Sequence, residues 1–249
     1  MTASQTARQR ARAELTREIK EEARRQVAAA GAQRLSLRAV ARQLGMASSA
    51  LYRYFPSRDD LLTALIIDAY DALGDRAERA VAALPRTDVR RRWRACCTAV
   101  RDWALAHPHE YALIYGSPVP GYQAPQETIP SASRVALVLG GLLADASTAG
   151  PATSRHGAGA FPQQPAPATA GEPGAPPLPE QLRQQAAAVG AAIAPGAGEV
   201  VIVRALIAWT QLFGMISFEL FGQLVGSADP AGDFFGYAVD QMADFVGLP

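Results

Sequence analysis

A group of residues near position 50 has the side chains needed to read DNA bases. Arginine can bind both acceptors on the major-groove edge of guanine at once, and tyrosine can pack on a thymine methyl group or reach a backbone oxygen. These two types occur together at Tyr52 and Arg53. They follow a run of small residues that would let a helix approach the bases closely, namely Ala47, Ser48, Ser49 and Ala50. The chemistry implied is base contact, with Arg53 as the first candidate for recognising guanine.

Such side chains work only if a helix carries them into the major groove, and the flanking sequence predicts a helix-turn-helix. Ala41 is small enough for the contact between two crossing helices, and Gly45 follows four residues later, where the turn is needed. Ser36 is suited to cap a helix over residues 37–44, and a second helical segment is expected to reach Phe55. Apolar residues with the spacing of a small core are Leu37, Val40, Leu44, Met46 and Leu51. The N-terminal residues of the second helix, 47–53, would then face the bases.

This region resembles the DNA-binding domain of the TetR/AcrR family of transcriptional regulators. The resemblance covers about 50 N-terminal residues and is carried by 35–62, including the run Leu-Gly-Met-Ala-Ser-Ser-Ala-Leu-Tyr-Arg-Tyr-Phe-Pro-Ser-Arg-Asp-Asp-Leu-Leu at 44–62. By the resemblance, Tyr54, Arg58 and Ser36 are expected to contact phosphates. Residues 47–50 depart from the commonest family form, so the resemblance does not imply an operator sequence. An alternative for Tyr54 and Phe55 is a place in the core.

The charge distribution supports contact with nucleic acid at one end of the chain. The 249 residues have a net charge of +1, but residues 1–60 hold twelve basic and six acidic side chains and the rest is −5. Arg8, Arg10 and Arg12 predict a flexible basic arm over residues 1–12 that enters the minor groove. The alternative is that these arginines add only nonspecific attraction.

Periodicity predicts an all-α protein with a second, larger helical domain. We expect the helix-turn-helix domain at 13–58 and a regulatory and dimerisation domain at 59–249. Residues 145–180 are rich in Pro, Gly and Ala and predict a disordered insertion. The further helices are expected at 59–83, 88–106, 109–115, 127–144, 182–193, 199–225 and 233–245.

Other features exclude several classes of protein. Apolar residues make up 49% of the chain, enough for a real core. No secretory signal is evident, and the longest apolar run, residues 135–144, is shorter than the roughly 20 residues that span a bilayer, so a cytoplasmic protein is expected. Cys96 and Cys97 are adjacent and are expected to be small packing residues rather than a disulfide. No catalytic motif, metal site or cofactor site is evident, so we expect neither an enzyme nor a cofactor.

The segment 199–225 is apolar almost all round and predicts a homodimer. A helix without a polar face must be covered on every side, so one side is expected to line the core and the other to pack on a second subunit. The last two helices of each subunit would form a four-helix seam. Two recognition helices about 34–36 Å apart would then read a pseudo-palindromic operator.

The larger domain also resembles a subgroup of the family named for a Trp-x-x-x-His-Gly signature. Residues 209–214 read Trp-Thr-Gln-Leu-Phe-Gly, and residues 116–122 read Gly-Ser-Pro-Val-Pro-Gly-Tyr. Candidate ligand-binding residues are seven aromatic residues and one carboxylate that needs a partner: Trp93, Trp103, Tyr111, Tyr115, Trp209, Phe213, Phe218 and Glu219. The alternative for each aromatic residue is ordinary core or dimer packing.

These observations predict a dimeric, ligand-responsive transcriptional regulator, foremost a repressor that a small, largely apolar effector releases from its operator. Two alternatives remain open. One is a helical dimeric small-molecule-binding protein without operator binding. The other is a regulator that binds DNA without a ligand, or only with one.

Overall fold

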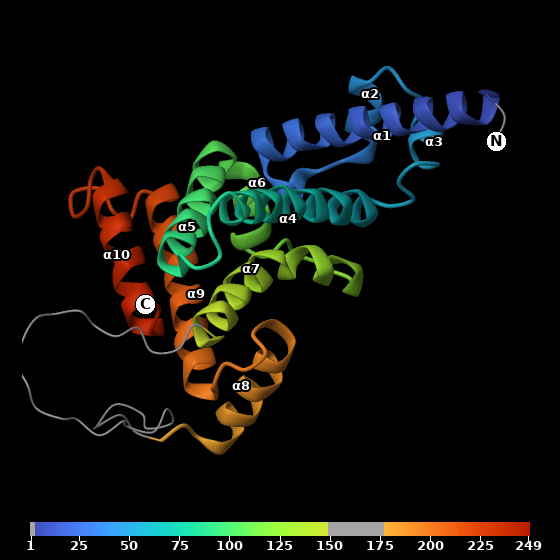
Figure 1. Ribbon diagram of the computed structural model, residues 1–249. Helices are drawn as coiled ribbons and strands as arrows, with labels where there is room; N and C mark the ends of the chain where they lie inside the picture. The colour runs from blue at the N-terminus through green and yellow to red at the C-terminus, as the bar shows by residue number, and fades with distance from the viewer. Residues whose placement is uncertain (1–2, 149–176) are drawn as a thin grey trace, which may run out of the picture. The chain divides into compact units, whose positions relative to one another are not determined.

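A computed structural model describes residues 3–148 and 177–249, with side chains from residue 7 onward. It confirms the all-α prediction, because the described residues contain helices and turns and no strand. The α-helices, labelled in Figure 1, are α1 Ala3–Ala30, α2 Leu37–Gln43, α3 Ser48–Leu51, α4 Arg58–Ala82, α5 Val89–Ala106, α6 Pro108–Tyr115, α7 Ile129–Thr148, α8 Glu180–Ile193, α9 Glu199–Leu220 and α10 Ala231–Val246. Short 3-10 turns lie at Ala32–Arg34 and Gln126–Thr128.

The chain forms two compact units, each made of two stretches of sequence. Unit 1 comprises Met1–Asp75 and Trp103–Arg134, and unit 2 comprises Arg76–Asp102 and Val135–Pro249. The boundaries fall inside α4, α5 and α7, so these three helices each contribute residues to both units. The predicted domain boundary at residue 58 therefore does not separate compact units.

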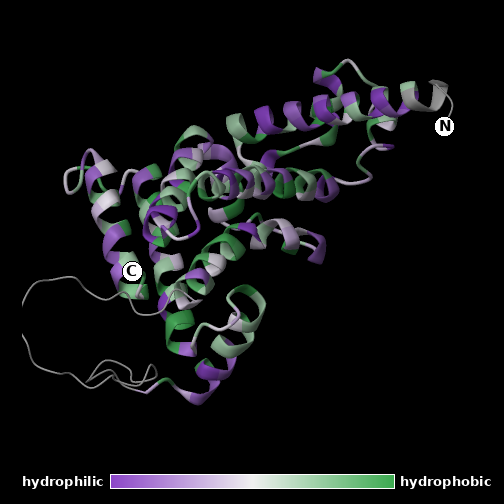
Figure 2. Ribbon diagram, viewed as in Figure 1, coloured by the Kyte–Doolittle hydropathy of each residue, from purple (hydrophilic) through white to green (hydrophobic). Residues whose placement is uncertain are grey.

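An apolar stripe with a spacing of four residues lies on the buried face of α1. Ile19, Ala23 and Val27 are buried, while most other residues of the helix are exposed. Figure 2 shows this pattern as hydrophilic residues along much of α1. The helix ends at Gly31, whose φ of +81° is accessible to glycine at little cost.

The prediction of a flexible arm over residues 1–12 is wrong for the described part. Residues from Ala3 onward form the first turns of α1, which carries Arg8, Arg10 and Arg12 as exposed side chains. The segment is rich in alanine, arginine and glutamine, which all favour the helix, and no residue in it breaks one. Charge alone indicated an arm, but helix propensity decides the backbone.

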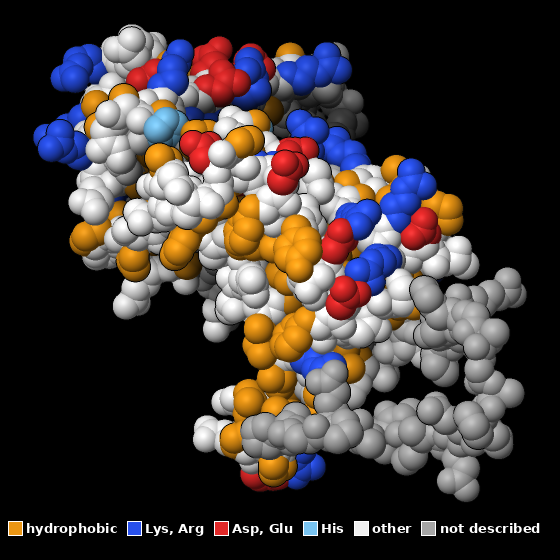
Figure 3. All heavy atoms as spheres, turned by 90° about the vertical axis from the view of Figure 1, so that its left-hand side faces the viewer, with side chains coloured by type: hydrophobic (Ala, Val, Ile, Leu, Met, Phe, Trp, Pro, Cys, Tyr) orange, Lys and Arg blue, Asp and Glu red, His pale blue; other side chains and the backbone are white. Residues whose placement is uncertain are grey.

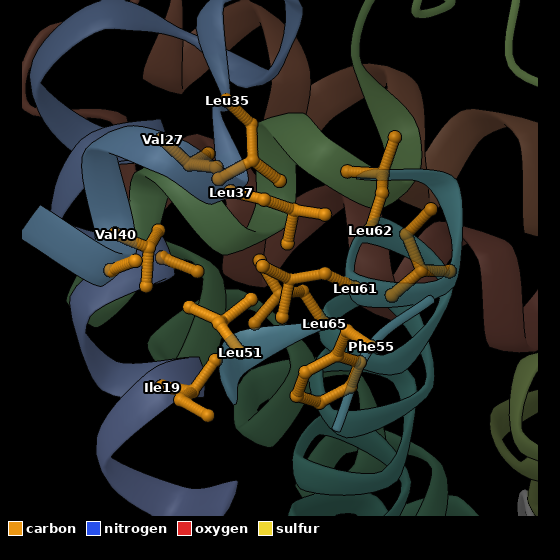
Figure 4. Packing of buried hydrophobic residues seen from close by; sticks show 13 residues of the cluster. Ile19, Val27, Leu35, Leu37, Val40, Leu51, Phe55, Leu61, Leu62 and Leu65 are labelled. Atoms are coloured by element: carbon orange, nitrogen blue, oxygen red, sulfur yellow. The ribbon is translucent and has the colours of Figure 1, made fainter. Parts of the chain in front are cut away.

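The predicted helix-turn-helix core forms, as Figure 4 shows. Ile19 of α1, Leu37 and Val40 of α2 and Leu51 of α3 pack together with residues of α4. Phe55 belongs to the same cluster and is 7% exposed, which supports its place in the core. This cluster fixes the orientation of α3.

Unit 1 extends beyond the helix-turn-helix because α6 and the loop after it cover the same core. Leu113, Ile114 and Val119 pack against the cluster. The hydroxyl groups of Tyr122 and Thr63 lie 2.9 Å apart, and Tyr70 Oη donates to the carbonyl of Ile114 at 3.3 Å. Since these residues lie 44 to 59 positions apart in the sequence, local patterns did not reveal the association.

In unit 2, the N-terminal part of α5 packs on α10. Trp93 is buried, and its indole N–H donates to the carbonyl of Val239 at 3.0 Å. Arg94 pairs with Asp240, and Arg90 pairs with Asp244 at 2.6 Å. The predicted order of helices in this part of the chain is confirmed, with small shifts at the ends.

Two of those shifts concern α7 and α9. α7 continues to Thr148, four residues beyond the predicted end, and residues 149–176 of the predicted insertion lie outside the described residues. α9 ends at Leu220 rather than 225, and Gly222 with a φ of +73° follows.

Residues 126–148 and α9 are each long and apolar enough to cross a membrane by length and composition alone, which the longest uninterrupted apolar run did not indicate. Both properties are shared by core helices of globular proteins. α9 also carries Glu219, which pairs with Arg101 of α5 within unit 2.

Candidate nucleic-acid interface and ligand cavity

The turn of the helix-turn-helix is set by a cap and a glycine. Ser36 Oγ accepts the backbone N–H of Ala39 at 3.4 Å, so it caps α2 as predicted. Gly45 has a φ of +66°, and the next amide, Met46 N–H, donates to the carbonyl of Ala41 at 2.8 Å. This hydrogen bond closes the turn at the end of α2. Its acceptor is Ala41, the small residue expected where the two helices touch.

α3 and the turn after it expose polar residues, while Leu51 at the end of the helix is buried. Leu51 is fully buried, whereas Ser49, Tyr52 and Arg53 are exposed. Ala47 begins the helix without a side-chain cap, and Ser48 and Ala50 are half-buried. The helix ends at Leu51, and residues 52–54 form a turn, so the segment is helical over a shorter length than predicted.

Tyr54 and Arg12 are two of the predicted DNA-contacting residues, and they lie against each other. The Arg12 guanidinium is 5.5 Å from the centre of the Tyr54 ring, a cation–π distance. Tyr54 is half-buried and packs against the core cluster, which matches the alternative of a core position for much of its ring. The contact joins the N-terminal part of α1 to the turn after α3.

Arg58, predicted to contact phosphate, is held within unit 1. Its Nη2 donates to the carbonyl of Ala32 at 2.9 Å, and its Nη1 is 3.1 Å from Asp59. Ser57 Oγ accepts the backbone N–H of Asp60 at 3.1 Å and so caps the start of α4. Arg58 therefore ties the start of α4 to the turn after α1.

Three basic residues on or next to α2 were not among the predicted DNA contacts. Arg38 and Arg42 lie one turn apart on α2, and both are exposed, as is Arg34 in the preceding turn. The i, i+4 spacing of Arg38 and Arg42, which puts both side chains on one face of α2, could have revealed them. They enlarge the basic surface beside α3.

α4 is tied to α1 and α7 by ion pairs. Asp68 of α4 pairs with two residues of α1, Lys20 at 2.8 Å and Arg24 at 2.5 Å. On α7, Arg134 Nη1 donates to the carbonyl of Asp71 at 3.0 Å, and the guanidinium also pairs with Asp75. Gly74 makes room for this side chain, because a Cβ there would lie 2.8 Å from Arg134.

The eight predicted ligand-binding residues do not line one cavity. Trp103, Tyr111 and Tyr115 belong to unit 1. Trp103 stacks on His107 with ring centroids 5.3 Å apart, and Tyr111 and Tyr115 lie at the same distance from each other. Burial raises the pKa of the Tyr115 hydroxyl above its ordinary value. Tyr115 also lies edge-on to Tyr70 of α4 with ring centroids 6.0 Å apart, so these residues are part of the packing within unit 1.

The remaining five belong to unit 2, and two of them, Trp93 and Trp209, line a cavity. Phe213 packs on Trp209 with ring centroids 4.6 Å apart. Phe218 is 55% exposed, so it lies on the surface and not in a cavity. The partner that Glu219 needs is Arg101, whose Nε donates to the carboxylate at 2.7 Å.

The cavity of unit 2 has a volume of about 180 Å³ and an almost wholly apolar wall. Its residues come from α5, α7, α8 and α9: Trp93, Ala136, Leu139, Gly140, Leu143, Val189, Ile193, Ile202, Ala205, Leu206 and Trp209. A different hollow of about 260 Å³ lies in unit 1, and its lining includes Arg24, Arg25, His107 and Glu110. Of these two, the unit 2 cavity has the chemistry expected for an apolar ligand.

The other chemistry-bearing residues are accounted for by packing. Cys96 and Cys97 are free and fully buried, and burial raises the pKa of the Cys96 thiol to about 12. A thiol with so high a pKa is a poor nucleophile at neutral pH, which supports the packing role predicted for the pair. Within residues 3–148 and 177–249, no group of three or more His, Cys, Asp or Glu side chains is arranged to hold a metal ion.

Comparison with known proteins agrees with this geometry. Residues 19–65 match the family model described as "Bacterial regulatory proteins, tetR family", and residues 93–242 match "Tetracyclin repressor-like, C-terminal domain". The HTH-type transcriptional regulator Rv1816 of Mycobacterium tuberculosis (strain ATCC 25618 / H37Rv) is 41% identical over 223 residues, which cover 87% of this chain and 85% of the relative. A relative from Mycobacterium bovis, HTH-type transcriptional regulator Mb1846, matches with the same values.

Solved structures show the same fold. The crystal structure of SCO4313 aligns with a TM-score of 0.70 at 32% identity and covers 95% of this chain and 98% of that chain. A structure of a protein with unknown function from Rhodococcus sp. RHA1 aligns with a TM-score of 0.64 at 23% identity, covering 94% of this chain and 95% of that chain.

Proposed function

Because the chain belongs to the tetR family of bacterial regulatory proteins and is a DNA-binding transcriptional regulator, we propose that it acts as a cytoplasmic, dimeric repressor released by a small apolar effector. The observation that carries the proposal is the arrangement of α3. This helix is anchored by Leu51 in the core and exposes Ser49, and the turn that follows it exposes Tyr52 and Arg53. An anchored helix with exposed donors is what major-groove reading requires.

Around α3, different residues are candidates for reading bases and for binding phosphates. Arg53 is the candidate for guanine, with Ser48, Ser49 and Tyr52 beside it. Arg34, Arg38 and Arg42 supply exposed positive charge for phosphates, and Arg8 and Arg10 of α1 supply more. Ser36 retains a hydroxyl proton that it can donate to a phosphate, since its oxygen serves as the acceptor in the cap.

Exposed apolar side chains on α9, α10 and the segment between them support a homodimer. Figure 3 shows hydrophobic side chains exposed in groups. Those in this part of the chain are Val200, Leu206, Ile207, Phe218, Phe221, Val225, Phe234, Tyr237 and Phe245. Two helices that expose so many large apolar residues fit a four-helix seam between two copies of the chain. The dimer would place two copies of α3 on one pseudo-palindromic operator.

In the proposed regulation, α7 links the effector cavity to the DNA-reading helix. α7 contributes Ala136, Leu139 and Leu143 to the cavity, and Arg134 of the same helix binds Asp71 and Asp75 of α4. α4 begins three residues after Phe55 of the helix-turn-helix core. An effector that shifts α7 would shift α4 and change the spacing of the two recognition helices. This requires the effector to bind the DNA-incompetent state more tightly.

The experiment is a DNA-binding titration of the full chain against DNA from upstream of its own coding sequence. We expect salt-sensitive, sequence-specific binding, which Arg53→Ala weakens by about tenfold to a hundredfold while the melting temperature stays unchanged. Tyr54→Phe is expected to have a smaller effect, since it removes one hydroxyl and keeps the ring against Arg12. Binding to no upstream fragment at low salt would contradict the proposal.

The same titration separates the alternatives. A small-molecule-binding dimer without operator binding would bind none of the fragments, with or without a ligand. A regulator that needs its ligand would bind DNA only after the ligand is added, and one that needs no ligand would keep its affinity throughout. The exposed basic residues around α3 favour the repressor over the first of these alternatives.

A further inference from the structure

We propose that the cavity of unit 2 binds an uncharged, mainly hydrocarbon molecule of one or two fused rings, and that this is the effector class of the protein. The assignment of the cavity stands on its lining and size, and the role as effector rests on the proposed function. The cavity lies between α7, α8 and α9, with Trp93 of α5 in its wall.

The wall excludes charged ligands. Its lining residues, all in the described part of the chain, are aliphatic residues, glycine and tryptophan, without an ionisable group or a hydroxyl. The indole N–H of Trp93 is already used by the carbonyl of Val239 at 3.0 Å. A carboxylate, phosphate or ammonium group would lose its hydration here and find no opposite charge, which costs several kcal/mol or more.

The volume limits the ligand to small molecules. A dry apolar cavity of about 150 Å³ in another protein holds one benzene molecule, and pockets for drug-sized ligands measure about 300–1,000 Å³. At about 180 Å³, this cavity fits a substituted benzene or a compact bicyclic molecule. The rings of Trp93 and Trp209 in the wall favour a flat aromatic ligand, because aromatic pairs stack or meet edge to face.

The wall between α7 and α8 is built by backbone contact, so it cannot widen through a rotamer change. A Cβ at Gly140 would lie 2.3 Å from the carbonyl oxygen of Ile193 at the end of α8. One turn earlier on α8, a Cβ at Gly190 would lie 3.1 Å from the side chain of Ile202 of α9. These two glycines let α8 lie close to both neighbours, and this proximity keeps the cavity small.

The test uses iodobenzene, a neutral ring whose iodine quenches tryptophan fluorescence on contact. The full chain has three tryptophans, and two of them line the cavity. We expect saturable quenching by iodobenzene, and binding at least about tenfold weaker for 4-iodobenzoate, which adds a charge, and for the three-ring 9-iodophenanthrene. Equal affinity for 4-iodobenzoate would overturn the ligand class, and equal affinity for 9-iodophenanthrene would overturn the size limit.

The location is tested by filling the cavity from two sides. Ala205→Phe on α9 and Ala136→Phe on α7 should each weaken iodobenzene binding by about tenfold or more, because the added ring occupies the cavity. Ala192→Phe is the matched control, since Ala192 is exposed on α8 and is not among the lining residues. If one filling variant does not fold by circular dichroism, the other decides. Unchanged binding in a folded filling variant would overturn the site.

The operator titration is run separately, so the two proposals can fail independently. If iodobenzene binds as expected but no upstream DNA is bound, the cavity assignment stands and the proposed function fails. If operator DNA is bound and iodobenzene gives no saturable quenching, the ligand class fails and the repressor assignment stands. Quenching together with unchanged operator affinity would overturn the effector role of this ligand class.

Discussion

At the residue scale, the surroundings of a side chain distinguish the residues that we propose to read DNA bases from those that support the fold. Arg53 is exposed, whereas the guanidinium of Arg58 donates to the carbonyl of Ala32. Glu219 shows the same principle in unit 2. Its residue type suggested an anchor for a ligand, but Arg101 occupies both carboxylate oxygens. The environment of a residue decides between two roles that its type allows.

Gly45→Ala should lower the free energy of unfolding by about 1–2 kcal/mol, because Gly45 has a φ of +66° that a residue with a Cβ adopts only at a cost. There is open space around the position, so the cost comes from the backbone and not from a clash. Gly141→Ala on α7 is the control, since its surroundings are also open and its φ is not positive, and it should be neutral or stabilising. Thermal unfolding measures both, and equal effects would contradict the explanation.

Glu219→Gln should lower the free energy of unfolding by about 2 kcal/mol, because it leaves Arg101 without its charged partner in a site where both side chains are less than a fifth exposed. Iodobenzene binding should stay unchanged, since neither residue lines the cavity. Glu180→Gln is the control, because the Glu180–Arg183 pair is exposed, and we expect no measurable change there. A loss of ligand binding without a loss of stability would restore the ligand role for Glu219.

At the element scale, α4 and α7 are the helices that we propose to connect the effector with DNA binding. α4 starts next to the helix-turn-helix core and receives ion pairs from α1 and α7. α7 carries both the cavity residues Ala136, Leu139 and Leu143 and Arg134, which binds α4. A helix transmits a displacement along its axis because its hydrogen bonds make it stiff, so these two elements are suited to connect a ligand with DNA.

Arg134→Gln should loosen α4 around residues 71–75, because it removes two charge-assisted contacts and keeps much of the side-chain length. We expect amide hydrogen exchange there to rise about tenfold, and operator affinity to respond less to an effector. Gly74→Ala should act in the same direction by displacing the Arg134 side chain. Arg91→Gln, an exposed position on α5, is the control, and exchange that changes equally in all three variants would count against a specific role for Arg134.

At the scale of the whole molecule, charge and apolar surface are placed in different parts of the chain. Residues 1–60, which contain the helix-turn-helix, hold twelve basic and six acidic side chains, while most of the large exposed apolar residues lie on α9, on α10 and between them. The proposed DNA-binding and dimerisation functions therefore involve different residues. Salt should weaken operator binding and leave dimerisation largely unaffected.

Phe218→Glu should shift the protein toward the monomer, because it places a charge in the proposed apolar seam. Ile129→Glu is the control, since Ile129 is 57% exposed against 55% for Phe218 but lies on α7. Analytical ultracentrifugation should show a dimer for the control and a weakened dimer for Phe218→Glu, with operator affinity reduced in parallel. A stable monomer for the unmodified chain would contradict the seam.

The sequence by itself was sufficient for the features that depend on neighbours within a turn or two. The cap at Ser36, the turn at Gly45 and the helix-turn-helix core are all local, because capping and apolar spacing act over three or four residues. The arm at residues 1–12 was predicted wrongly from local information that was present, since charge was given more weight than helix propensity.

The tertiary structure decided everything that joins distant segments. It places Trp93 and Trp209 at the cavity of unit 2 and Tyr111 in unit 1. It pairs Glu219 with Arg101, 118 residues away in the sequence. It also places Arg134 against α4, at least 59 residues away. An aromatic or charged residue on a helix shows in the sequence that it needs a partner, but not which one. The partner follows from how the helices pack, and packing depends on the shapes of all the surfaces at once.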